Sequence, residues 1–226
     1  MRREIFRVDA DRALALLARA PIVHLATTTP AGAPVLRALD AAVLGDAIYF
    51  HGARAGEKAA CLGRPAVVSA EEVVARVPSW MLDPLRACPA TTLFRSVQVH
   101  GTLTEVTDLG AKARALESLM RRWQPEGLHR PIDAEDPLYR RELEGVLVFA
   151  VPFERVDGKW KLLQNRGPEE IGRILRGLRE RGAPGDAEVI EAIRAENPGV
   201  PDPPYLAPAP DRAAMPRDGG RPDEST

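Results

Sequence analysis

The chain has 226 residues, of which 45% are hydrophobic and 28% are charged, and its formal net charge is -1 at pH 7. This composition is typical of a soluble globular protein, and the near-zero charge excludes the strong positive field of a nucleic-acid-binding domain. No apolar run approaches the roughly 18 residues that span a membrane, and the first residues lack the pattern of a signal peptide. We therefore expect a cytoplasmic protein that binds neither nucleic acid nor membrane.

The N-terminal part predicts a helix followed by an antiparallel meander. Apolar residues recur at helical spacing after Asp9, a residue type that caps helices, and Pro21 ends the helix. Strands are predicted over 22–28, 34–44 and 47–51, because these stretches are rich in apolar and β-branched residues and are separated by turn residues. Short turns between three strands favour an antiparallel sheet over βαβ units.

The middle of the chain predicts two more strands around a long loop. A short helix over 55–62 is followed by a strand over 65–77. Residues 78–93 contain three prolines and no clear periodicity, which predicts a long loop with room for one helical turn, and alternating residues predict a strand over 95–106. Loops of this length inside a compact domain are often functional.

The remaining strands complete a mainly β pattern. Thr107 or Asp108 caps another helix, and two strands over 146–151 and 159–164 are predicted to join across a turn at Asp157-Gly158. The count is then about six strands, mostly antiparallel, with few helices between them. This pattern favours a β-barrel with helices packed at its ends.

The C-terminal part has a different character. Pro168 at a first helical position and Gly182 after the last turn predict a well-capped helix, and a second helix follows it. Beyond these, the composition is dense in proline, alanine, aspartate and glycine, which cannot offset the entropy of ordering. We expect a barrel domain over 1–166, a helical extension over 167–200 and a proline-rich, disordered tail over 201–226.

The two cysteines, Cys61 and Cys88, do not form a pair spaced like a zinc site or a redox dithiol. We expect no disulfide framework and no metal site. The sequence also has no nucleophile elbow, Walker loop or dinucleotide glycine fingerprint, so hydrolase and nucleotide-triphosphatase functions lack support. Cys88, beside Pro89, is either an ordinary structural cysteine or an exposed thiol near a pocket.

Two cations suggest an anion site. Arg37 lies within an apolar strand, where a charge is costly unless it meets a partner or a ligand. Residues 52–58 join a strand to the start of a helix and supply small residues, free backbone N–H groups and the ammonium of Lys58. Together these features suit a phosphate monoester. The alternative is that Arg37 pairs with an acidic neighbour such as Asp40 and that Lys58 is solvated.

Three stretches carry a recognisable pattern. They are Val35–Leu39 together with Ala47–Lys58, then Arg95–Gly101, then Lys159–Arg166. The first two resemble the FMN-binding segments of the pyridoxamine 5'-phosphate oxidase-like superfamily. The third is similar to the Lys-x-x-Gln-Asn-Arg signature of the superfamily's FMN-binding negative transcriptional regulators. The residues His51-Gly52-Ala53 are similar to those of the superfamily's nitroimidazole-resistance proteins. The resemblance covers about residues 10–182 and implies a six-stranded antiparallel split β-barrel that binds FMN.

This resemblance implies site residues position by position. Arg37 and Lys58 would hold the FMN phosphate, and the backbone around Ala38 and Leu39 would approach the isoalloxazine ring. The ribityl and phosphate region would be lined by Phe50, His51 and Glu57. Members of the superfamily bind the flavin at a dimer interface, so the partner subunit of a homodimer would contribute Ser96, Gln98, Trp160, Lys161 and Gln164. Glu57 stands where true pyridoxamine-phosphate oxidases carry arginine, which weakens phosphate binding and argues against that particular activity.

The function expected from these residues is an FMN-dependent oxidoreductase that acts on an unidentified small molecule, with a nicotinamide cofactor as electron donor. Flavin supplies the hydride or electron chemistry itself, so no acid-base constellation is required. The alternative is a flavin- or haem-binding sensor without turnover, in which His51 or His100 is an axial ligand rather than a structural histidine. Transcriptional control is a third reading, but no helix is basic enough on one face to bind DNA directly.

Overall fold

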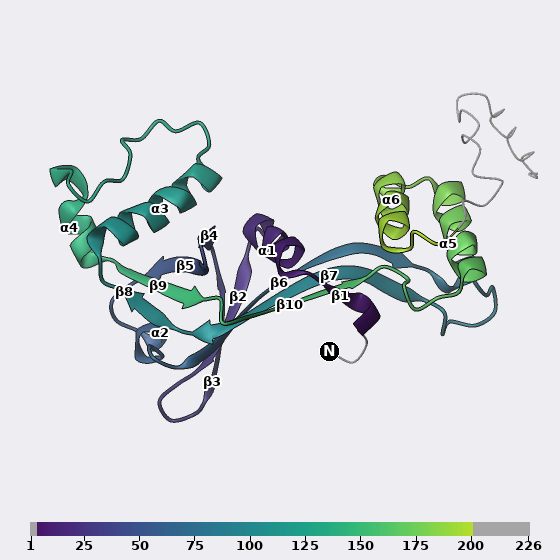
Figure 1. Cartoon of the computed structure of the whole chain (residues 1–226), viewed down its shortest axis with the longest axis horizontal. Helices are drawn as coiled ribbons and strands as arrows, with labels where there is room; N and C mark the ends of the chain where they lie inside the picture. Colours follow the sequence, from purple (N-terminus) through teal and green to yellow (C-terminus); the bar gives the residue numbers. More distant parts are fainter. Residues whose placement is uncertain (1–3, 201–226) are drawn as a thin grey trace, which may run out of the picture. The chain divides into compact units, whose positions relative to one another are not determined.

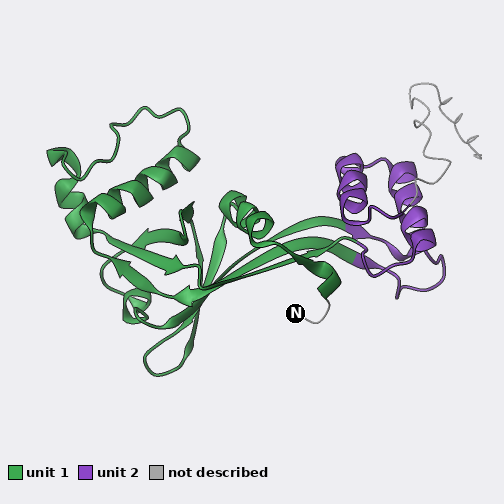
Figure 2. Cartoon of the chain, viewed as in Figure 1, with its two compact units in different colours: residues 1–75, 92–162 green, residues 76–91, 163–226 purple. Residues whose placement is uncertain are grey.

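The computed structural model describes residues 4–200, and the chain forms two compact units (Figures 1 and 2). Unit 1 comprises residues 1–75 and 92–162, and unit 2 comprises residues 76–91 and 163–226. The tail over 201–226, which we predicted to be disordered, lies outside the described residues.

Within residues 4–200, ten strands lie wholly or mainly in unit 1, and the ends of two of them, β6 and β7, belong to unit 2. Its helices are η1 (Glu4–Phe6), α1 (Ala10–Arg19), α2 (Glu57–Ala60), α3 (Leu109–Trp123) and α4 (Pro137–Gly145). Its strands are β1 (Arg7–Val8), β2 (Val23–Thr28), β3 (Pro34–Leu39), β4 (Ala42–Leu44), β5 (Ala47–Gly52), β6 (Pro65–Val77), β7 (Thr91–Thr102), β8 (Thr104–Val106), β9 (Leu147–Pro152) and β10 (Arg155–Lys161). Most predicted elements are therefore present near their predicted positions.

The strands form two antiparallel sheets rather than one barrel. Sheet A has six strands in the order β1-β10-β7-β6-β2-β3, and sheet B has four in the order β4-β5-β9-β8. The inner faces of the two sheets share one hydrophobic core, in which Leu25 and Val97 of sheet A and Phe149 of sheet B are fully buried. The prediction of a mainly β, antiparallel fold is confirmed. The predicted six antiparallel strands correspond to sheet A, but this sheet does not close into a barrel, and four further strands form sheet B.

Two predicted strands each divide between the sheets. The stretch 34–44 breaks at Asp40 and Ala41, so that β3 pairs with β2 in sheet A and β4 pairs with β5 in sheet B. The stretch 95–106 breaks at Leu103, whose backbone N–H and C=O bond to Arg64 (2.9 Å) and Gly63 (2.8 Å) instead of to a neighbouring ladder. The chain thus passes from one sheet to the other at both breaks.

The Asp157-Gly158 pair is not a turn, contrary to the sequence prediction. Both residues lie inside β10, where Gly158 pairs with Val97 on one side and with Val8 on the other. A Cβ atom on Gly158 would lie 2.5 Å from Val8 Cγ2 and 2.8 Å from Ala13 Cβ. This glycine is required for close packing of α1 on the sheet rather than for a reversal of the chain.

The N-terminal helix forms as predicted. The Asp9 carboxylate accepts a hydrogen bond from Arg12 N at 2.8 Å, and the helix ends at Ala20, directly before Pro21. Its buried residues Leu16 and Leu17 pack in the core of unit 1, so α1 covers the inner side of sheet A. Asp108 caps α3 in the same way, through Ala111 N.

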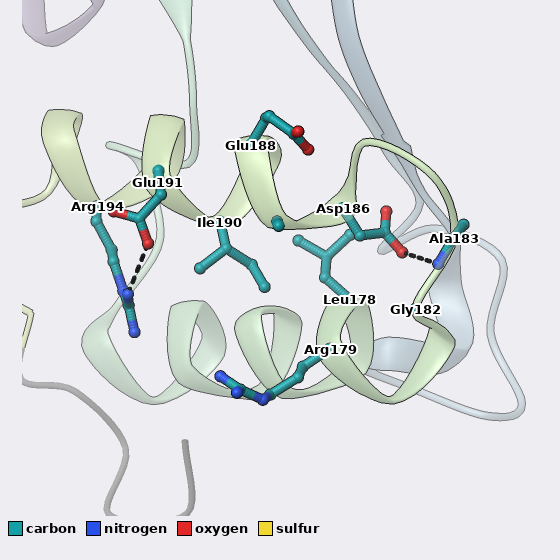
Figure 3. A pocket seen from close by; sticks show the side chains of 10 residues that line it. Leu178, Arg179, Gly182, Ala183, Asp186, Glu188, Ile190, Glu191 and Arg194 are labelled. Atoms are coloured by element: carbon teal, nitrogen blue, oxygen red, sulfur yellow. Dashed lines mark hydrogen bonds and ion pairs between the residues drawn. The ribbon is translucent and has the colours of Figure 1, made fainter. Parts of the chain in front are cut away.

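Unit 2 is built around two helices, α5 (Pro168–Arg181) and α6 (Asp186–Glu196), with the short helix η2 (Ser79–Met81). Gly182 ends α5 with a left-handed φ of 56°, as the sequence predicts. Asp186 is the first residue of α6 rather than its cap. A pocket of about 660 Å³ lies between α5 and α6, and Figure 3 shows the ion pair of Arg194 with Glu191 on its lining.

Asp186 holds the connection between the two helices together. Its side chain is 7% exposed, it pairs with Arg181 at 2.5 Å, and it accepts a hydrogen bond from Ala183 N at 2.8 Å (Figure 3). The hydrogen bond from Arg181 lowers the pKa of Asp186 below its ordinary value of 3.8. A lowered pKa in the folded state means that the ionised carboxylate stabilises the fold above that value.

We expect Asp186→Asn to lower the free energy of unfolding of the helical pair by about 1–3 kcal/mol at pH 7, the cost of losing a charge-assisted hydrogen bond. Amide hydrogen exchange across α5 and α6 measures it, with Glu188→Gln as a control, because Glu188 is exposed in the same helical turn. The difference should persist down to about pH 4 and shrink as the pH falls through the lowered pKa. An equal effect of both substitutions would contradict this role.

Candidate functional site

Arg37 reaches the start of α2 from the edge strand β3. It pairs in register with the buried Leu25, so it lies on the inner side of sheet A. Its guanidinium donates to the Glu57 carboxylate and, at 2.6 Å, to the carbonyl of Leu36. The acidic partner of Arg37 is therefore Glu57, twenty residues away, and not Asp40. Both side chains of the pair are nearly half exposed, so the pair contributes about 0–1 kcal/mol and a ligand can replace it.

Lys58 follows directly and supplies a second cation. Its Nζ lies 5.8 Å from the centre of the Phe149 ring, and a Cβ atom added to Gly52 would lie 2.9 Å from the same nitrogen. Gly52 thus leaves the space that the ammonium occupies. Within the described residues no carboxylate lies within ion-pair distance of Lys58. The ammonium is only partly exposed, and Lys58 follows Glu57 of the Arg37–Glu57 pair directly in the chain.

Phe50 supports this site from below. It is 1% exposed and stacks on Phe149, with ring centroids 5.4 Å apart. The sequence-based expectation was that Phe50 lines the ribityl region. Its side chain lies in the core instead, where it packs against the Phe149 ring, and the Lys58 ammonium lies over that same ring.

His51 lies on the other side of sheet B. Successive side chains of a strand point to opposite faces, and the inner face of β5 carries Phe50 and Gly52. His51 therefore points away from Lys58, toward α3 and α4, where it lines a cavity with Leu116 and Leu143. The structure does not bring His51 together with the two cations.

The remaining predicted residues fall into three places. Ala38, Ser96, Gln98 and Lys161 lie on the outer face of sheet A, because their strand neighbours face the core. Leu39 shares the inner face with Arg37 and packs against the core. Trp160 also lies on the inner side, with the guanidinium carbons of Arg12 and Arg95 at 4.0 Å and 4.7 Å from its ring centre. Gln164 belongs to unit 2.

The sequence matches the family described as pyridoxamine 5'-phosphate oxidase over residues 9–160, more than half of its length. The chain belongs to the pyridoxamine 5'-phosphate oxidase-like family. Of the predicted site residues, this match covers all but Lys161 and Gln164. A search of curated proteins gives no match.

Solved structures with a similar fold include the following three proteins. One is described as a 5-nitroimidazole antibiotic resistance protein from Bacteroides thetaiotaomicron (18% identity, 68% of this chain and 85% of that chain, TM-score 0.54). The second is an FAD and haem binding protein from Mycobacterium smegmatis (22%, 68% and 71%, 0.55). The third is the flavocytochrome Anf3 from Azotobacter vinelandii (21%, 70% and 69%, 0.56). At these identities the likeness shows a shared split-barrel fold.

In this oxidase-like chain, the loop that leads to Lys58 is tied to α4. Arg54 donates to the carbonyls of Glu144 (2.5 Å) and Gly145 (3.2 Å), and its guanidinium lies 3.8 Å from Glu105. These carbonyls belong to the last turn of α4, where backbone acceptors lack partners within the helix. The bonds hold the loop in place. Sequence reasoning missed Arg54 as an anchor, because nothing near it in the chain signals a partner ninety residues away.

Lys112 completes the same arrangement from α3. It is 2% exposed, and its Nζ donates to the carbonyls of Leu143 (3.0 Å) and Val146 (2.8 Å). Burial lowers the pKa of this ammonium, and the positive charge of Arg54 adds to the effect. Nothing near Lys112 in the chain signals carbonyl partners more than thirty residues away, so its role could be found only in the structure.

No candidate metal site is present in the part of the chain that the structure describes. Over residues 4–200 no group of three or more histidine, cysteine, aspartate or glutamate side chains is placed to hold a metal ion. His100, a candidate haem ligand in the sequence, is held by Asp157 at 3.2 Å and by Arg155 at 2.8 Å. Across the same residues no helix has the length and apolar character to cross a membrane.

Proposed function

We propose that this protein binds FMN and uses it as an oxidoreductase on a small molecule. The observation that carries the proposal is that Lys58, which has no carboxylate partner among the described residues, follows Glu57 of the exchangeable Arg37–Glu57 pair at the start of α2. Family membership supports it, as does the fold shared with proteins described as binding FAD or haem. The residues fit a phosphate dianion, because an ammonium and a guanidinium can both donate charge-assisted hydrogen bonds to it.

The bound flavin would supply the hydride or electron transfer, so the chain need only bind, orient and shield it. In the proposal Lys58 and Arg37 hold the phosphate, and Gly52 keeps the space for the ammonium open. Phe50 and Phe149 form the apolar floor beneath Lys58.

The proposed site is completed by a second copy of the chain. The outer face of sheet A carries Ser96, Gln98 and Lys161, together with Leu36, which is 61% exposed. In a homodimer this face would bring the three polar residues to the flavin of the partner subunit. Analytical ultracentrifugation with and without FMN tests the arrangement, and a monomer at micromolar concentration in both conditions would contradict it.

Glu57 is expected to act as a built-in competitor for the phosphate. We expect Glu57→Gln to tighten FMN binding about fivefold, since it frees Arg37 from a pair worth up to about 1 kcal/mol. Flavin fluorescence titration measures the effect. Glu72→Gln is the matched control, because Glu72 pairs with Arg19 (2.6 Å) and Arg95 (3.4 Å) rather than with Arg37 or Lys58. A weaker affinity in the Glu57 variant would show that the carboxylate helps to hold the ligand.

Purification provides the direct test of the proposed function. We expect a yellow protein that releases FMN on denaturation, bleaches under NADPH or NADH in the absence of oxygen, and regains its colour with a suitable acceptor. A yellow protein that neither donor bleaches would favour a flavin-binding sensor. A Soret band would favour haem binding, for which His51 is the available ligand, since the other histidines have side-chain partners. A colourless protein that takes up neither cofactor would refute the proposal.

A further inference from the structure

A cavity of about 320 Å³ lies in unit 1 between α3 and α4, on the side of sheet B that faces away from Lys58. Helix α3, helix α4 and the loop between them supply most of the lining, and strand β5 supplies His51. The lining residues are His51, Leu116, Leu119, Met120, Ile132, Tyr139, Glu142, Leu143 and Val146. A volume of this size lies at the lower end of the range for small-molecule sites, about 300–1,000 Å³, and suits a molecule of one or two rings.

The polar groups around the cavity are already engaged. Lys112 turns its ammonium to the carbonyls of Leu143 and Val146, and the Tyr139 hydroxyl donates to the carbonyl of Arg130 at 2.5 Å. Glu142 is exposed, so its carboxylate stays in water at the rim. A charged ligand would therefore find no fixed counter-charge on the inner wall.

His51 is the exception among these groups. Of the four histidines, all of which fall within residues 4–200, the other three have a carboxylate partner, namely Glu71, Asp157 and Glu117. No hydrogen bond or ion pair engages the imidazole of His51. His51 is exposed and so lies at the mouth of the cavity, where one free hydrogen-bonding group beside an apolar wall orients a ligand without demanding charge.

The loop that forms the roof is held in place independently of any ligand. The Glu117 carboxylate accepts hydrogen bonds from Ile132 N (3.1 Å) and from Arg121 (3.2 Å), and it contacts His129 at 3.3 Å. The bond from Ile132 lowers the pKa of Glu117. A second tie joins Arg130 to Asp136 at 3.0 Å. These contacts keep Ile132 over the cavity, so the space does not depend on a ligand to hold it open.

We propose that the cavity between α3 and α4 is a binding site for an uncharged, mainly apolar molecule of one or two rings, with one polar group directed at His51. The cavity opens to solvent beside His51 and Glu142, and an apolar space whose walls are held by several restraints is a preformed site. The proposal is independent of the flavin site, because Lys58 lies on the opposite face of sheet B.

Indole is a suitable probe, with tryptamine and indole-3-acetate as its cationic and anionic analogues. We expect saturable binding of indole to the full chain, seen as amide shifts at the residues lining α3 and α4, and at least tenfold weaker binding of both charged analogues. The absence of saturable binding, or tightest binding by a charged analogue, would overturn the proposal. Shifts confined to the outer face of sheet A would also overturn it.

Substitutions locate the probe. Leu116→Trp fills the cavity, and we expect it to weaken indole binding at least tenfold, whereas Leu138→Trp should not, because Leu138 is on α4 but 54% exposed and outside the lining. Leu116→Ala enlarges the space and should retain binding, so the test survives if the tryptophan variant fails to fold. Equal affinity in all three variants would refute the assignment. FMN titration of the same variants separates the two proposals. A variant that loses indole binding but still binds FMN bears only on the cavity between α3 and α4.

Discussion

Replacing Lys58 by alanine is expected to weaken FMN binding about 10- to 100-fold. The loss of a hydrogen bond to a charged group costs about 1.5–3 kcal/mol, and every 1.4 kcal/mol is tenfold in Kd. Lys58 has no carboxylate partner in the described chain, so its removal leaves no buried charge behind. Combined with Arg37→Ala, the change should abolish flavin retention while the chain stays folded.

The measurement compares FMN with riboflavin, which lacks the phosphate. If Lys58 contacts the phosphate, the variant loses affinity for FMN but binds riboflavin as the wild type does. Arg140→Ala is the control, because Arg140 is an exposed cation on α4 whose partner is Glu144. Equal losses for both flavins would place Lys58 elsewhere on the cofactor, and unchanged FMN affinity in the double variant would remove the site assignment.

Replacing Gly101 by alanine is expected to destabilise the fold by about 3 kcal/mol, at the upper end of the usual cost of overpacking. A Cβ atom there would lie 2.2 Å from the carbonyl oxygen of Pro152 and 3.0 Å from Val151 Cγ1. The first contact is with backbone, which cannot rotate away as a side chain can. Strands β7 and β9 must therefore separate at this point, where the chain is about to leave sheet A.

Urea unfolding followed by circular dichroism measures the loss. Gly145→Ala is the control, because no atom lies within 4 Å of a Cβ added to Gly145 at the end of α4. We expect that control to change stability by less than about 0.5 kcal/mol, as for most uncrowded surface substitutions. A Gly101 variant that unfolds at the wild-type midpoint would show that the two strands accommodate the methyl group.

Local signals in the sequence predicted individual elements well. The caps at Asp9 and Asp108 and the glycine at 182 define helix ends through bonds within a few residues, which the sequence contains. The division of 34–44 and 95–106 between two sheets was missed. That choice depends on which distant strand supplies the hydrogen bonds, and residue pattern does not specify the partner.

The candidate site shows the same limit. Arg37 and Lys58 were predicted as a pair and do lie near the same short helix, but the carboxylate that meets Arg37 is Glu57 and not the nearby Asp40. The separation of His51 from Lys58 follows from the alternation of side chains along β5. The sequence alone could therefore have predicted that Phe50 and His51 point to opposite faces. The hydrogen bonds of Arg54 and Lys112 could not be predicted from neighbouring residues, because each side chain binds carbonyls more than thirty residues away.

Because of the breaks at residues 40–41 and 103, we expect unit 1 to unfold as a single cooperative structure. Each break lets one continuous segment contribute a strand to both sheets, so neither sheet can detach without pulling residues out of the other. The slowly exchanging amides of β5 and β9 should then show the same free energy of opening as those of β2 and β7, because both sheets open in one global unfolding event rather than in two steps. A protein built this way has little means of loosening one layer while the other remains intact.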